Sequence, residues 1–184
     1  TDGVVGTPAA GDWGGVGFTD SGASGSVLAY TTVRYGGWYW AFNGYNTYGS
    51  VVVASGAAPS LHHLTVRNGN NTGIQIAASP VMSNVTVRNC YAGITVASGS
   101  PVITDSTMSN NTWGFQAGGG APNLTRCTIR DNATYGFYCN GASVPAGNVT
   151  LSWSSASGNT PITYTAKNSL GSTLCSTTGT SCTI

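Results

Sequence analysis

The carboxylates of the chain decide whether it could act on a polysaccharide. Cleavage of a glycosidic bond needs two carboxylates on one face of a fold, and Ca²⁺ binding needs several carboxylates close together. All five acids of the 184-residue chain are aspartates: Asp2, Asp12, Asp20, Asp105 and Asp131. Asp105 and Asp131 are each the only acid of a 21-residue segment. Asp105 and Arg126 occupy equal places in successive segments, which predicts an exposed ion pair. The sequence therefore predicts no catalytic residues.

Metal ligands are equally sparse. His62 and His63 are adjacent, and neighbouring side chains on a strand point to opposite faces, so we expect surface histidines that do not chelate one ion. None of the five cysteines has CxxC spacing. Cys90, Cys127 and Cys139 are expected to be small buried hydrophobic residues. We predict no metal site and no cofactor.

Two columns of polar side chains could bind a partner. Threonine recurs at the same place in four segments and arginine recurs two residues later, with Ser109 replacing one arginine: Thr65, Thr86, Thr107, Thr128, Arg67, Arg88 and Arg130. Threonine suits an exposed strand in any case. A glycan or an anionic partner would compensate the repulsion between stacked arginines. The aromatic segment with Trp38, Trp40 and Tyr45 could stack on sugar rings, and packing in a core or against another subunit is equally consistent with it.

The element that positions these residues is an internal repeat. Pro59, Pro80, Pro101 and Pro122 are spaced by 21 residues, and the segments that follow them align. One apolar column holds Val66, Val87, Met108 and Ile129, with polar residues on either side. This alternation is typical of strands, and stacking coils at about 4.8 Å buries like residues on like. We predict an all-β fold, a right-handed parallel β-helix with 21-residue coils.

The same alignment places amides at the turns. Asn68, Asn89, Asn110 and Asp131 form one column just after the first strand of each coil, which predicts a ladder of side-chain hydrogen bonds. Sequons would permit N-glycosylation at Asn70, Asn84, Asn110, Asn123, Asn132 and Asn148. Asn-rich turns beside Thr-rich strands also generate sequons by chance.

Composition limits the classes of partner. Only 6% of the residues are charged and the formal net charge is +1, which gives no electrostatic reason to expect nucleic acid or a membrane surface. No apolar run is long enough to span a membrane, and we expect any export signal to have been removed. Few charges and many Ser, Thr, Asn and Gly residues predict a surface that contacts protein, glycan or ice.

Residues 11–37 resemble the opening coils of bacterial extracellular proteins with pectate-lyase-like β-helix repeats. The matching residues are Gly11, Trp13, Gly15, Val16, Phe18, Ser26, Leu28, Tyr30, Tyr35 and Gly37. The resemblance covers about residues 11–142 and is specific for fold, while its functional content is weak. It implies an extracellular or cell-surface location. Many proteins of this kind cleave polysaccharides, so a lyase or hydrolase is the third functional alternative.

Residues 148–184 are similar to the first half of a bacterial fibronectin type III domain. The matching pieces are 149–153, 161–164 and the stretch from Cys175 to Cys182, and the resemblance implies a disulfide between these two cysteines. We therefore divide the chain into a β-helix (1–144) and an incomplete fibronectin III/Ig-like β-sandwich (145–184). Half a sandwich leaves open edges, which a strand from another subunit could complete.

These expectations favour a non-enzymatic structural subunit of an extracellular filament or cell-surface assembly, formed by self-association. The alternative is a glycan-binding or adhesive surface module.

Overall fold

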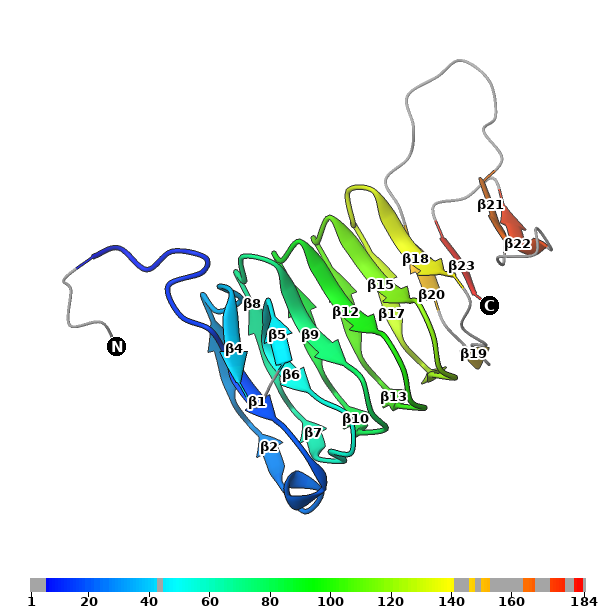
Figure 1. Cartoon of the computed structure of the whole chain (residues 1–184). Helices are drawn as coiled ribbons and strands as arrows, with labels where there is room; N and C mark the ends of the chain where they lie inside the picture. Colours follow the sequence, from blue (N-terminus) through cyan, green and yellow to red (C-terminus); the bar gives the residue numbers. More distant parts are fainter. Residues whose placement is uncertain are drawn as a thin grey trace.

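The computed structural model describes residues 6–42 and 45–140, and the strand segments 146–147, 150–152, 164–167, 173–177 and 181–183. Short strands follow one another around a stack of coils, and each strand pairs in parallel with its counterpart in the next coil (Figure 1). The predicted parallel β-helix with 21-residue coils is confirmed. No coil could bury its apolar side alone, so the stack provides the core.

Three sheets run the length of the stack. Sheet A contains β1 (Val16–Phe18), β6 (Gly49–Val53), β9 (Thr72–Ile76), β12 (Ala92–Val96), β15 (Trp113–Ala117) and β18 (Tyr135–Cys139). Sheet B contains β2 (Val27–Ala29), β7 (Ser60–His62), β10 (Val81–Ser83), β13 (Val102–Thr104), β16 (Asn123–Thr125) and β19 (Ala146–Gly147). Sheet C contains β3 (Thr32–Arg34), β8 (Thr65–Arg67), β11 (Thr86–Arg88), β14 (Thr107–Ser109), β17 (Thr128–Arg130), β20 (Thr150–Ser152) and the antiparallel β23 (Ser181–Thr183).

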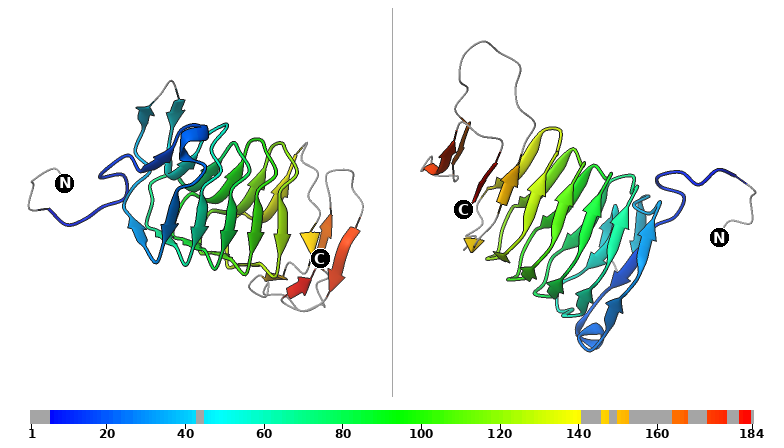
Figure 2. Two further views of the ribbon diagram at one scale, coloured as in Figure 1. Left: turned by 90° about the horizontal axis from the view of Figure 1, so that it is seen from below. Right: turned by 180° about the vertical axis from the view of Figure 1, so that it is seen from behind.

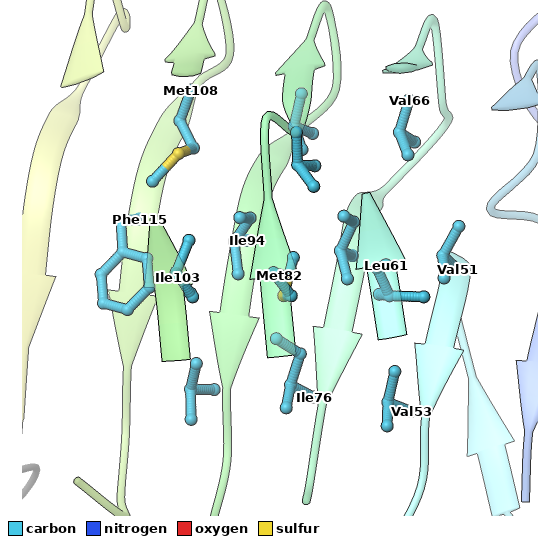
Figure 3. Packing of buried hydrophobic residues seen from close by; sticks show 14 of the residues in the cluster. Val51, Val53, Leu61, Val66, Ile76, Met82, Ile94, Ile103, Met108 and Phe115 are labelled. Carbon is cyan, nitrogen blue, oxygen red and sulfur yellow. The ribbon is translucent and has the colours of Figure 1, made fainter. Parts of the chain in front are cut away.

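The core consists of columns of identical or similar side chains. Val66, Val87, Met108 and Ile129 are fully buried and in register between the strands of sheet C. The corresponding column of sheet B is also fully buried and in register, and it consists of Leu61, Met82, Ile103 and Leu124. Figure 3 shows members of both columns, among them Val66, Met108, Leu61 and Met82, in the packed interior. Burying one such side chain is worth about 1.5–3 kcal/mol. This stacking of like on like explains why the alternation in sequence predicts the register.

Each coil turns twice at a single non-glycine residue with positive φ. The corner between sheets B and C holds Tyr30, His63, Asn84, Asp105 and Arg126, with φ between 50° and 53°. The corner after sheet C holds Tyr35, Asn68, Asn89, Asn110 and Asp131, with φ between 54° and 62°. Asn and Asp adopt this conformation readily, whereas Tyr, His and Arg adopt it at a cost of about 1–2 kcal/mol. These corners set the directions of the side chains considered below.

The first coil is longer than the others. Leu28 aligns with Leu61 and Val33 with Val66, which is the 33-residue offset that the sequence suggests. The extra residues include an antiparallel hairpin of β4 (Trp40–Phe42) and β5 (Tyr45–Thr47), which stands off the side of the stack (Figure 2). A short 3-10 helix (Ser21–Ala23) precedes β2, and Asp20 caps it by accepting a hydrogen bond from the Gly22 N–H at 2.8 Å.

The division of the chain at residue 144 stays a prediction. β19 and β20 pair in parallel with β16 and β17 and so extend sheets B and C by one coil. Two further strands, β21 (Tyr164–Lys167) and β22 (Thr173–Thr177), form an antiparallel pair. The fibronectin type III-like sandwich predicted for residues 145–184 is not shown, and most of those residues lie outside the described part of the chain.

Candidate functional site: an arginine and threonine face

The two predicted polar columns lie side by side on the outer face of sheet C. Thr32, Thr65, Thr86, Thr107 and Thr128 are aligned in register across five strands. Arg34, Arg67 and Arg88 form the second column, which continues through Ser109 to Arg130. On each strand the two columns flank a buried apolar residue, so their threonines and arginines face outward, whereas Ser109 itself is buried. Thr32 and Arg34 extend the face by one coil beyond the predicted residues. We call these two columns the Arg/Thr face.

Three arginines of this face are stacked without counter-ions. Arg67 lies directly opposite Arg34 on one side and Arg88 on the other. Like charges in this arrangement are destabilising. Among residues 6–42 and 45–140, the ion pairs are Arg126–Asp105 and Arg130–Asp131, so none of the three has a carboxylate partner. Arg34 instead lies over the ring of Tyr35, at 5.6 Å from its centroid. The face therefore concentrates positive charge at its N-terminal end.

The predicted aromatic residues lie elsewhere. Trp38 is exposed just after the second corner, and the indole N–H of Trp40 donates to the Gly49 carbonyl of β6 at 3.2 Å. Trp40 thus packs beside sheet A and not on sheet C. Tyr45 lies in β5, and its side chain is outside the described residues. The structure therefore separates the predicted binding residues onto two faces.

A second aromatic group, which the sequence analysis missed, lies on the outer side of sheet A. Trp113 contacts the rings of Tyr91, Tyr135 and Tyr138, at centroid distances of 5.9, 5.3 and 5.9 Å. Tyr91 and Tyr135 are about half exposed. In the sequence, Trp113 and Tyr135 come directly before Gly114 and Gly136, which begin the second apolar stretch of their coils. This shared position is the sequence feature from which the aromatic group could have been predicted. Tyr91 and Tyr135 are the solvent-exposed rings of the group, and Trp113 and Tyr138 are partly buried between them.

Every acid of residues 6–42 and 45–140 has a structural partner. Asp12 accepts from the Ala9 N–H at 2.8 Å, and Asp20 caps the short helix. Asp105 forms a two-pronged pair with Arg126, whose Nε and Nη2 donate to its two carboxylate oxygens at 2.6 and 2.7 Å. These hydrogen bonds lower the pKa of Asp105. Asp131 accepts from Nη1 of Arg130 at 2.5 Å.

The two histidines are closer than predicted. His63 occupies a corner with φ of 50° instead of continuing the strand. Its ring therefore does not point to the other face of the sheet, away from the ring of His62. The Nδ1 atoms of the two rings are 3.2 Å apart. The premise that adjacent residues must diverge is wrong here because the strand ends at His62. Within the described part of the chain, no three His, Cys, Asp or Glu side chains group together.

Three cysteines are unpaired thiols in the described segments. Cys90 and Cys127 are buried and Cys139 is half-buried. Burial raises the pKa of the Cys90 and Cys139 thiols to about 11 and also raises the pKa of Cys127. The thiolate is the reactive form, so these side chains serve as packing residues. The side chains of Cys175 and Cys182 lie outside the described residues, and their pairing stays a prediction.

The hydrogen-bonded ladder differs from the predicted one. Of the predicted column Asn68, Asn89, Asn110 and Asp131, one pair is joined by side chains: Asn89 Nδ2 donates to Asn68 Oδ1 at 3.1 Å. A second, interior ladder lies one residue later. Asn111 Oδ1 accepts from the Cys90 N–H at 3.0 Å, and Asn132 Oδ1 accepts from the Asn111 N–H at 2.9 Å.

The sequons are not equivalent. Asn70, Asn84, Asn110 and Asn123 are exposed. Asn132 uses its amide nitrogen to donate to the Met108 carbonyl at 3.1 Å, so a glycan there would break the interior ladder. Asn148 lies outside the described residues.

Comparison with known proteins identifies the family of the chain. No helix among the described residues is long and apolar enough to cross a membrane. Neither the curated proteins nor the solved structures gave a match. A family model described as "Right handed beta helix region" matches residues 43–184, which is more than half of the chain. With its parallel sheets in register and its 21-residue coils, the chain belongs to the right-handed β-helix family.

Proposed function

We propose that this protein is a non-enzymatic extracellular module that binds an acidic glycan on its Arg/Thr face. One observation carries the proposal: Arg34, Arg67 and Arg88 are stacked in register with no carboxylate partner among the described residues. The repulsion between these arginines costs stability in the free protein. An anionic ligand would relieve it, so the same arginines would favour the bound state.

The geometry also indicates the shape of the ligand. The three arginine positions follow one another along the stack at the spacing of parallel strands, about 4.8 Å. A polysaccharide with a carboxylate or sulfate on successive sugars could follow this line, and the adjacent threonine hydroxyls could bond its hydroxyl groups. A nucleic acid fits less well, because the formal net charge of the chain is only +1.

The aromatic residues support glycan binding independently. Tyr91 and Tyr135 present half-exposed rings beside the partly buried Trp113 on sheet A, at a distance from the charged columns. Stacking of sugar rings on such side chains needs no charge. The absence of a carboxylate pair within the described residues supports a non-enzymatic role.

The binding experiment compares one polymer in two charge states. Affinity electrophoresis would use gels containing polygalacturonate or its fully methyl-esterified form, which has the same backbone without the charge. We expect retardation by the acidic polymer and loss of this retardation in Arg67→Ser/Arg88→Ser, which copies Ser109 of the next coil. Equal migration of both proteins in both gels would refute the proposal. Prolonged incubation should release no shortened or unsaturated chains, and release of either would restore the enzyme alternative.

The second candidate function is the structural subunit of a filament or surface layer. The observation that favours it is the edge formed by β1, β2 and β3, each of which has one neighbouring strand in its sheet among the described residues. An edge of this kind can pair with another copy. This candidate function includes the expectation that a strand donated by another copy completes a fibronectin-like sandwich at 145–184. That expectation rests on sequence resemblance. Electron microscopy of the native protein would show regular fibres if it is correct.

A further inference from the structure

The corner between sheets B and C brings two imidazole rings together. In the other coils the same two places hold Ala29–Tyr30, Ser83–Asn84, Thr104–Asp105 and Thr125–Arg126, and the second residue has positive φ each time. Only one coil places histidine at both positions. The turn at His63 directs its ring toward that of His62, and their Nδ1 atoms are 3.2 Å apart.

Tyr30 of the preceding coil positions both rings. Its ring stacks on His63 at 4.6 Å between centroids and 12° between planes. It also meets His62 edge-on, at 5.7 Å and 89°. Ring packing of this kind is worth about 0.5–1.5 kcal/mol per pair. The histidines therefore have neighbours that hold them, although His63 itself is exposed.

The separation of the two nitrogens suits a shared ion. An ion bound to two imidazole nitrogens at about 2.0–2.1 Å with a tetrahedral angle would place them about 3.3 Å apart. In the Nδ1···Nδ1 contact the hydrogen belongs to one of the two rings. Metal binding through both Nδ1 atoms requires that ring to change tautomer, so that its hydrogen moves to Nε2 through solvent and both rings coordinate as neutral imidazoles. The neighbouring coils place Ala29 and Ser83 beside His62, and Tyr30 and Asn84 beside His63, so these stacked neighbours bring no cation to repel the ion.

We propose that His62 and His63 form a surface site for a divalent transition-metal ion of the Zn²⁺, Ni²⁺ and Cu²⁺ class, with the two Nδ1 atoms as its protein ligands. Imidazole ligands favour these ions, whereas Mg²⁺ and Ca²⁺ prefer oxygen. Water completes the coordination, so the ion is exchangeable. This inference is independent of the Arg/Thr face, which lies on sheet C.

The test is a calorimetric titration of the untagged full chain with Ni²⁺. We expect one ion per chain, and at least tenfold weaker binding in His62→Ser/His63→Asn. This variant copies Ser83–Asn84, which the protein uses at the same corner one coil later, so the fold is retained. Because it keeps all five cysteines, thiol binding cannot account for the loss.

Two further measurements make the result specific. Asn84→Ser, in the adjacent coil, should leave Ni²⁺ binding unchanged. The ring ¹⁵N resonances should show coordination through Nδ1 in both histidines when diamagnetic Zn²⁺ is added. Absence of binding by the wild-type chain, equal affinity of the double variant, or coordination through Nε2 would each overturn the proposal.

Discussion

The side-chain oxygen of Asn111 accepts a hydrogen bond from the backbone N–H of Cys90, one coil earlier, at 3.0 Å. The Asn111 amide nitrogen donates to the Val87 carbonyl at 3.2 Å, and the side chain is buried. One asparagine therefore binds two backbone groups of the preceding coil, the Cys90 N–H and the carbonyl of Val87 in β11. The interior ladder consequently joins coils that are otherwise held by strand pairing and apolar packing.

Replacement of Asn111 should be costly. Asn111→Ala removes both of these buried hydrogen bonds and leaves a cavity beside the Cys90 N–H, and we expect the free energy of unfolding to fall by about 2–4 kcal/mol. Urea denaturation followed by circular dichroism measures this change. Asn110→Gly, at the exposed corner residue next to it, tolerates the positive φ and should change stability by less than about 1 kcal/mol. Equal losses in both variants would contradict the role of the interior ladder.

Two glycines of sheet A, Gly93 in β12 and Gly114 in β15, should tolerate no side chain. A Cβ at Gly93 would collide with the carbonyl oxygen of Gly114 in the next coil, and one at Gly114 would lie 2.5 Å from the oxygen of Gly136. We expect Gly93→Ala to destabilise the protein by at least about 2 kcal/mol, because strand backbones must separate to accommodate the methyl group. Thermal denaturation would show this loss as a lower unfolding temperature. The control is Gly118→Ala, where a Cβ meets nothing within 4 Å, and its unfolding temperature should be nearly unchanged.

Salt should stabilise the protein through the Arg/Thr face. Arg34, Arg67 and Arg88 repel one another in the absence of ligand, and raising the ionic strength from about 0.01 to 1 M shortens the Debye length from about 30 to 3 Å. We expect the unfolding free energy to rise with added NaCl, and this dependence to weaken in Arg67→Ser/Arg88→Ser. Arg126→Asn removes an arginine that is already paired with Asp105, so it should not weaken this salt dependence. If the unfolding free energy of the wild-type protein did not change with NaCl, the repulsion between these three arginines would be contradicted.

The buried thiols predict a decline of stability at alkaline pH. The pKa of Cys90 and that of Cys139 are raised to about 11 in the folded protein, so these thiols keep their protons when the unfolded chain has lost them. Stability is complete below the unfolded pKa, near 8.5, and falls between that value and about 11. The buried Cys90 thiol contributes a slope of up to about 1.4 kcal/mol per pH unit in this window, and the partly exposed Cys139 thiol contributes less. Chemical denaturation at several pH values should show a shallower decline in Cys90→Ala.

Much of the fold could be predicted because it depends on local repetition. The 21-residue spacing of Pro59 to Pro122 and the Val66 to Ile129 column determine both the coil length and the register. The Arg/Thr columns follow from the same register. The sequence could not show that His63 ends a strand, because positive φ at histidine, tyrosine or arginine has no compositional signature. The proximity of His62 and His63 was missed for this reason.

The interior ladder was missed for a related reason. Asn110 and Asn111 are adjacent, and composition does not indicate which amide points inward. The corner residue Asn110 takes the positive φ and projects outward, so Asn111 enters the core. At the C-terminal side, resemblance to another family led us to expect a sandwich strand where β20 continues sheet C.

The measurement that tests the proposed function most directly is the affinity for a short oligogalacturonate, measured by isothermal titration calorimetry. Wild type would be compared with Arg67→Ser/Arg88→Ser and with Arg126→Asn, which removes a charge outside the Arg/Thr face. The account predicts at least tenfold weaker binding in the double variant, unchanged binding in Arg126→Asn, and weakening of wild-type binding by salt. Equal affinities in all three proteins, or no binding by the wild-type chain, would contradict it.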